Sequence, residues 1–129
     1  MIRRRVFEFC GRSGLWRALR AGMRLVPGTW LPVLTYHRVC PFDPETPWDP
    51  DVISATPEAF AEQLRFIKRQ FTPITSERIL RYRDNGLELP PNPVVITFDD
   101  GYRDNRTVAL PLLREAGVTA DFFVCPGNV

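Results

Sequence analysis

The chain has 129 residues, of which 44% are hydrophobic and 25% are charged. This length suits one small domain, and the composition is that of a globular rather than a disordered protein. A net charge of +2 gives no sign of a nucleic-acid partner, and we expect none. The cysteines at positions 10, 40 and 125 show neither zinc-site spacing nor a disulfide framework. No apolar run is long enough to span a membrane.

Residues 1–28 form a basic amphipathic segment, in which Leu15, Leu19 and Met23 recur every four residues and predict a helix. Arginines interrupt its apolar residues, which argues against a secretory signal peptide. We therefore expect a cytoplasmic or membrane-peripheral protein rather than a secreted one. The favoured interpretation is a helix packed on the following domain, residues 29–129. The alternative is a peripheral contact between residues 1–28 and an anionic membrane.

The first element of that domain is a β-rich run over residues 31–39, which predicts a strand with His37 near its end. Residues 40–57 are rich in proline and acids and predict a long loop. Thr56 and Pro57 are typical of a helix start, with Thr as the N-cap. The helix then carries an apolar stripe of Phe60, Leu64 and Ile67.

Alternating strand and helix patterns continue to the end of the chain. The predicted ranges are a strand at 71–74, a helix capped by Ser76 and closed by Asn85-Gly86, a buried strand at 94–98, a helix at 104–116 and a strand at 118–125. Pro111 lies inside the third helix and predicts a bend or a late start of the helix there. This order indicates an α/β fold with a parallel sheet, open or barrel-like.

Two adjacent carboxylates, Asp99 and Asp100, follow the buried strand directly, and Gly101 comes next. The carboxyl ends of parallel strands are where α/β enzymes build their sites. Gly101 permits a turn that would let both carboxylates serve one site. One of them would bind a cation and the other would handle protons. The alternative is a loop that caps the following helix without any chemistry.

The segment Val-Ile-Thr-Phe-Asp-Asp-Gly-Tyr at 95–102 closely resembles the first motif of polysaccharide deacetylases, the NodB-homology or carbohydrate esterase family 4 enzymes. Residues 109–113, Gly117 and 121–124 are similar to the helix and strand that follow it. Residues 34–39 are similar to the first-strand motif of the subgroup that acts on exopolysaccharides. The resemblance covers residues 31–129 and corresponds to the N-terminal portion of such a domain.

This resemblance implies a metal-dependent hydrolase that removes N-acetyl or O-acetyl groups from an amino-sugar polysaccharide. It implies a distorted (β/α) barrel, of which this chain would supply about four strands. Asp99 would be the general base and Asp100 a ligand of a divalent metal such as zinc. His37 and Tyr102 would contact the substrate or support the metal site. In such enzymes two downstream histidines complete the metal site, and a later histidine protonates the leaving amine.

The chain departs from this pattern because it contains a single histidine, His37. Asp99, Asp100 and water form an oxygen-only site, which suits Mg²⁺ or Ca²⁺ better than zinc. We therefore expect the N-terminal part of a longer enzyme, incomplete or inactive on its own and doubtful in its metal occupancy.

Two other functions fit parts of the pattern. A non-catalytic, degenerate deacetylase module could bind glycan or a partner through its loop aromatics. A phosphoryl-transfer receiver also places acids at strand ends, but it needs a further Asp and a strand Lys. Lys68 lies on a predicted helix, so the receiver interpretation fits poorly.

Overall fold

Strand β5 (Pro93–Phe98) is the central strand of the sheet, and all six of its residues are buried. The computed structural model describes residues 30–43, 45 and 50–128. The predicted amphipathic segment 1–28, with its membrane alternative, lies outside the described residues. Among the described residues, no helix is both long and apolar enough to cross a membrane.

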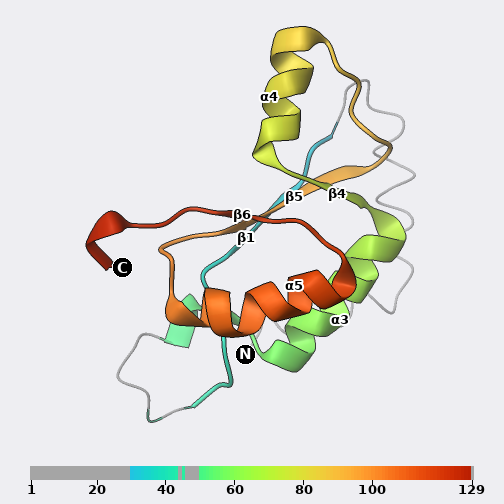
Figure 1. Ribbon diagram of the computed structural model, residues 1–129. Coiled ribbons are helices and arrows are strands. Elements are labelled where there is room, and N and C mark those ends of the chain that lie inside the picture. Colours follow the sequence, from blue (N-terminus) through green and yellow to red (C-terminus); the bar gives the residue numbers. More distant parts are fainter. Residues whose placement is uncertain (1–29, 44, 46–49, 129) are drawn as a thin grey trace. The chain divides into compact units, whose positions relative to one another are not determined.

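Four parallel strands form the main sheet, which Figure 1 shows crossing the middle of the described unit. Strand β1 (Val33–Tyr36) pairs with one edge of β5, in a register that sets Tyr36 opposite Phe98. Strands β4 (Thr72–Ile74) and β6 (Asp121–Phe122) also pair with β5. Because every pair is parallel, all four strands run in the same direction. The last residues of β1 and β6 lie opposite Phe98, the last residue of β5.

A second, two-stranded sheet follows β1 in the chain. Strand β2 (Arg38–Val39) pairs in parallel with β3 (Ile53–Ala55), which the 3-10 turn η1 (Pro50–Val52) precedes. The single strand predicted over 31–39 is therefore wrong, since the chain changes sheets at His37. The loop predicted over 40–57 is wrong in part, because it contains β3, a strand that the pairing with β2 stabilises.

The helices α3 (Pro57–Gln70) and α5 (Leu110–Ala116) both pack on one face of the main sheet (Figure 1). The apolar stripe predicted for α3 is confirmed, because Phe60, Leu64 and Ile67 are all buried. The core between helices and sheet includes Phe60, Leu64, Val94, Ile96, Phe98 and Leu113. Fully burying a side chain of this size contributes about 1.5–3 kcal/mol to stability.

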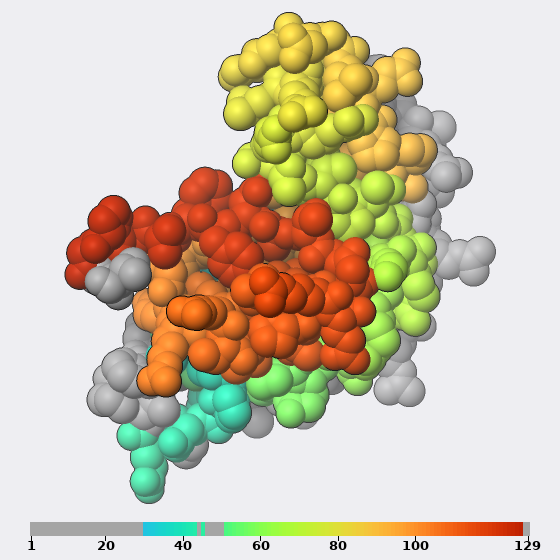
Figure 2. Space-filling model, in the orientation of Figure 1, coloured from blue at the N-terminus to red at the C-terminus, as the bar shows by residue number. Residues whose placement is uncertain are grey.

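Helix α4 (Ser76–Asn85) has no buried residue and stands apart from this core, as the yellow helix of Figure 2 shows. The predicted end is confirmed, since Gly86 is left-handed with φ 65°. The predicted cap is wrong, because Ser76 is the first helical residue. The backbone amide of Ser76 donates to Asp121 Oδ2 over 2.7 Å. The helix is therefore capped by a side chain of strand β6, which lies 45 residues later in the sequence.

The third predicted helix begins at Arg103 and contains a π-helical segment, η2 (Asn105–Ala109), which α5 continues. The amide of Leu110 donates to the carbonyl of Asn105. Pro111 has no amide hydrogen and its ring crowds the carbonyl four residues earlier, so a widened turn relieves this conflict. Gly117, with φ 62°, ends the helix as predicted. Strand β6 is shorter than the predicted 118–125, and the 3-10 turn η3 (Pro126–Asn128) follows it.

Candidate functional site

The two carboxylates lie at the end of the central strand, at a turn of the backbone. Asp99 and Asp100 are half-buried, and the amide of Asp99 extends the ladder between β1 and β5 by donating to Tyr36 O over 2.9 Å. Asp100 has φ 70° and Gly101 has φ 76°. This turn breaks the alternation of side chains that a continued strand would impose. The turn predicted at Gly101 is confirmed and begins one residue earlier, at Asp100.

The segment after β6 packs against this acidic loop. The amide of Phe123 donates to Phe98 O over 2.8 Å, and a Cβ at Gly101 would overlap the side chain of Val124. The thiol of Cys125 lies 3.9 Å from Asp100 Oδ1. Figure 2 shows this segment, in red, on the surface. Cys125 is a neighbour of the site that was not predicted from the sequence. Its place at the end of the last predicted strand was the available signal.

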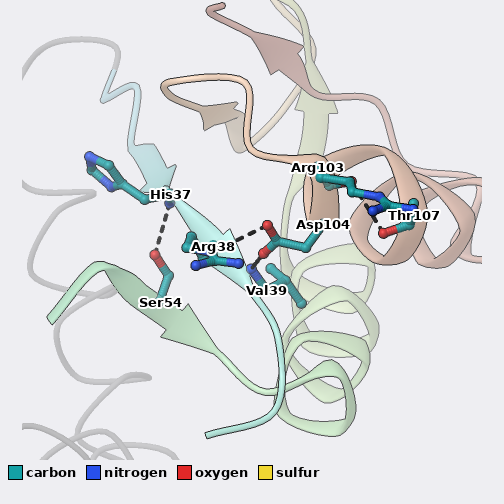
Figure 3. A network of polar contacts seen from close by, with 7 residues as sticks. All are labelled: His37, Arg38, Val39, Ser54, Arg103, Asp104 and Thr107. Atoms are coloured by element: carbon teal, nitrogen blue, oxygen red, sulfur yellow. Dashed lines mark hydrogen bonds and ion pairs between the residues drawn. The ribbon is translucent and has the colours of Figure 1, made fainter. Parts of the chain in front are cut away.

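His37 directly follows the last residue of β1, and Asp99 directly follows the last residue of β5. Both therefore lie at the same end of these two strands. The register pairs Tyr36 with Phe98, so the residues that follow them are neighbours across the two strand ends. The backbone N–H of His37 donates to Ser54 Oγ over 2.9 Å. Figure 3 shows the imidazole pointing away from Arg38 and Asp104. The structure thus brings the backbones of His37 and the acidic pair to one sheet edge.

Tyr102 belongs to a second group of side chains, centred on a buried carboxylate. Asp104 Oδ2 accepts the backbone N–H of Val39 at 2.9 Å, and Oδ1 accepts Arg38 Nε–H at 3.3 Å (Figure 3). The guanidinium of Arg38 lies over the Tyr102 ring, 5.0 Å from its centroid. Partial burial raises the pKa of the neighbouring Cys40 thiol; the charge of Arg38 opposes this and that of Asp104 adds to it.

The residue types at the site meet only part of a metal's needs. Asp100 offers a carboxylate and Cys125 a sulfur close to it. Within the part of the chain that the structure describes, no group of three or more His, Cys, Asp or Glu side chains is placed to hold a metal ion. A structural or catalytic zinc site takes at least three protein ligands. The described residues therefore do not fit a complete zinc site.

Comparison with known proteins gives a consistent family. Residues 86–129 match the family described as polysaccharide deacetylase. The chain is similar to a de-N-acetylase from Aggregatibacter actinomycetemcomitans, with 25% identity over 71% of this chain and 36% of that one, and a TM-score of 0.61. It is similar to the Streptococcus pyogenes deacetylase PplD in complex with acetate, with 27% identity, coverages of 73% and 42%, and a TM-score of 0.63.

A third solved structure, IcaB from Ammonifex degensii, is 30% identical over 75% of this chain and 39% of its own, with a TM-score of 0.62. No curated protein matches the chain in sequence. The chain spans between 36% and 42% of the length of these three solved proteins. The α/β fold of the described residues matches part of the NodB-homology fold of these solved deacetylases. The resemblance to polysaccharide deacetylases is thereby confirmed.

Proposed function

We propose that this chain carries the base-and-ligand half of a metal-dependent deacetylase site that acts on an amino-sugar polysaccharide. The observation that carries the proposal is the turn at Asp99, Asp100 and Gly101, at the end of the central strand and inside the region that matches the family. Its chemistry is removal of an acetyl group from nitrogen or oxygen. Acetate, which accompanies the similar Streptococcus pyogenes deacetylase, is the product of such a reaction.

Asp99 is the proposed general base, and a backbone hydrogen bond fixes its position. Its amide is tied to Tyr36 O, so the residue is held at the sheet edge while its carboxylate is left to accept a proton. The water that adds to the acetamide carbonyl must lose a proton as it attacks. A positioned base contributes a factor of about 10²–10⁴ to the rate of such a step.

Asp100 is the proposed metal ligand, and His37 and Tyr102 are proposed to contact substrate or support the site. The resemblance to polysaccharide deacetylases implies a metal-dependent enzyme, in which a divalent ion would supply Lewis-acid polarisation of the acetyl carbonyl. The ligands present in the described residues do not complete a zinc site. The one histidine of the chain cannot provide two nitrogen ligands. We therefore propose that the chain alone holds a metal weakly and does not turn over substrate.

The proposal is tested on the purified chain by zinc binding in equilibrium dialysis. Asp100→Asn is expected to weaken zinc binding, because it removes a charged oxygen ligand, whereas Asp99→Asn is expected to leave it unchanged. Asp84→Asn, which alters an exposed carboxylate paired with Arg83, is the matched control. Equal zinc binding in the wild type and Asp100→Asn would contradict the ligand assignment.

Acetate release from acetylated chitooligosaccharide is measured on the same samples. We expect none from the chain alone. Release that a chelator abolishes would overturn the proposed incompleteness and support the deacetylase assignment. If the chain does turn over, Asp99→Asn should lower the rate by about 10²–10⁴, and retained turnover would overturn its role as base.

A second function is favoured by the incomplete ligand set together with the exposed aromatic and aliphatic side chains beside the acidic loop. Phe123 and Val124 are both more than half exposed, and apolar side chains at a site edge suit contact with a sugar ring. This alternative is a non-catalytic module that binds glycan. Saturable binding of amino-sugar oligomers without acetate release, lost when Phe123 is replaced by Ala, would favour it.

A further inference from the structure

Asp104 lies outside the proposed base and ligand, yet its carboxylate joins two segments of the candidate site. It is five residues beyond Asp99, at the start of the helix that the acidic loop enters. Its oxygens accept one hydrogen bond from the Val39 backbone and one from the Arg38 side chain. Both partners directly follow His37. One carboxylate therefore connects the end of β1 to the acidic loop, across 65 residues of sequence.

The segment that Asp104 holds is poorly fixed by its own strand pairing. Strand β2 has only two residues, and its register with β3 shifts between Arg38 and Val39. A shift of this kind leaves a backbone group without its ladder partner. The buried amide of Val39 instead donates its hydrogen bond to the Asp104 carboxylate. A side chain thus takes the place that a neighbouring strand would have.

The second bond of Asp104 extends this control to Tyr102. The Arg38 and Asp104 side chains are only 15% and 9% exposed, so water competes little for their contact. With its Nε held, the Arg38 guanidinium lies over the Tyr102 ring. The position of the Tyr102 ring therefore depends on Asp104 through Arg38. Tyr102 follows Asp99 by three positions in the sequence.

We propose that Asp104 is a positioning residue of the candidate active site, which sets the places of His37 and Tyr102 around Asp99. This inference rests on the proposed function of Asp99, although its test does not require turnover. Asp104 acts through Val39 and Arg38 rather than on substrate. Ser54, which accepts the His37 amide from β3, holds the same segment from the opposite side.

The test uses the single histidine of the chain as a reporter. Its imidazole resonances in an NMR spectrum of the whole chain need no assignment among several histidines. Asp104→Asn keeps the shape of the side chain and one acceptor but removes the charge that holds Arg38. We expect it to shift the His37 and Tyr102 ring resonances while circular dichroism shows the same helix content.

Asp121→Asn is the matched control, because Asp121 also accepts a backbone amide, that of Ser76, with a charged oxygen. It should lower stability yet shift the two ring resonances less than Asp104→Asn does. If Asp104→Asn does not fold, Arg38→Gln decides, since it keeps the Val39 bond and removes the charge over Tyr102. Unshifted Tyr102 resonances in folded Arg38→Gln, or unshifted His37 and Tyr102 resonances in folded Asp104→Asn, would overturn the proposal. Neither result bears on acetate release, so the proposed function is judged separately.

Discussion

Gly101 lies where the acidic loop and the segment after β6 come closest. Its φ of 76° belongs to the left-handed region, and a Cβ there would overlap Val124. Gly86 has a similar φ of 65°, but a Cβ there would meet nothing within 4 Å. The two glycines therefore share a backbone conformation and differ in the space around them.

Gly101→Ala is predicted to destabilise the chain more than Gly86→Ala does. A left-handed backbone disfavours alanine by about 1–2 kcal/mol at either position. The overlap with Val124 adds to this loss at Gly101 alone. Unfolding free energies from urea titrations of both variants measure the difference, and equal losses would show that Val124 moves aside without penalty.

Tyr36 is a buried residue whose ionisation links stability to pH. It is 8% exposed, packs against Phe60 and Phe98, and donates its hydroxyl to Gln63 Oε1 over 2.7 Å. Burial raises the pKa of Tyr36 to about 12, from 10.0. Between these values the unfolded chain releases the proton and the folded chain retains it. Stability from this group is therefore complete below pH 10 and is lost as the pH rises toward 12.

Tyr36→Phe is predicted to flatten the fall of stability in this alkaline window. The wild type should lose up to about 3 kcal/mol more than the variant across it. Unfolding free energies of both proteins at several pH values provide the measurement. Parallel curves for the two proteins would mean that Tyr36 ionises as readily in the folded chain as in the unfolded one.

Among the secondary-structure elements, helix α3 begins with an N-cap, Thr56, that its sequence predicts. Thr56 Oγ1 accepts the amide of Ala59 at 3.3 Å, and Pro57 occupies the first helical position. Thr56→Ala is predicted to lower the unfolding free energy by about 1 kcal/mol, because it leaves that amide without its acceptor. Thr56→Ser, which keeps the hydroxyl, should lose less. Urea unfolding compares them, and an equal loss would assign the effect to the methyl group.

Elements with strong local signals were predicted well, and those that depend on distant partners were not. The cap at Thr56, the apolar stripe of α3 and the buried run of β5 are each encoded within a few residues. Strand β3 exists because it pairs with β2, and the cap of α4 is supplied by Asp121. No local pattern carries such information.

The candidate site likewise contains residues that the local sequence predicts and residues that depend on distant partners. The acidic pair and Gly101 stand together in the sequence, and the buried strand before them predicts their place at the sheet edge. Asp104 and Ser54 were missed, because their partners Val39 and His37 lie 65 and 17 residues away. Contacts of that separation follow from the topology, which brings β1 beside β5 and β3 beside β2.

For the described unit as a whole, burial is unevenly distributed between β5 and α4. Every residue of β5 is buried, whereas α4 buries none. Local opening is easiest where few apolar contacts must be broken. We predict that the amides of α4 exchange hydrogen much faster than those of β5. Hydrogen exchange followed by mass spectrometry measures both, and equal protection would mean that α4 unfolds only together with the sheet.

The left-handed backbone of Asp100 has a consequence for how this molecule balances stability against chemistry. Glycine adopts that conformation more readily than any residue with a Cβ, although aspartate tolerates it better than most. A chain selected for stability alone would carry glycine at position 100 as well as at 101. The carboxylate of Asp100 thus lies where the local backbone disfavours a side chain, and the proposed role of Asp100 as a metal ligand would account for this cost.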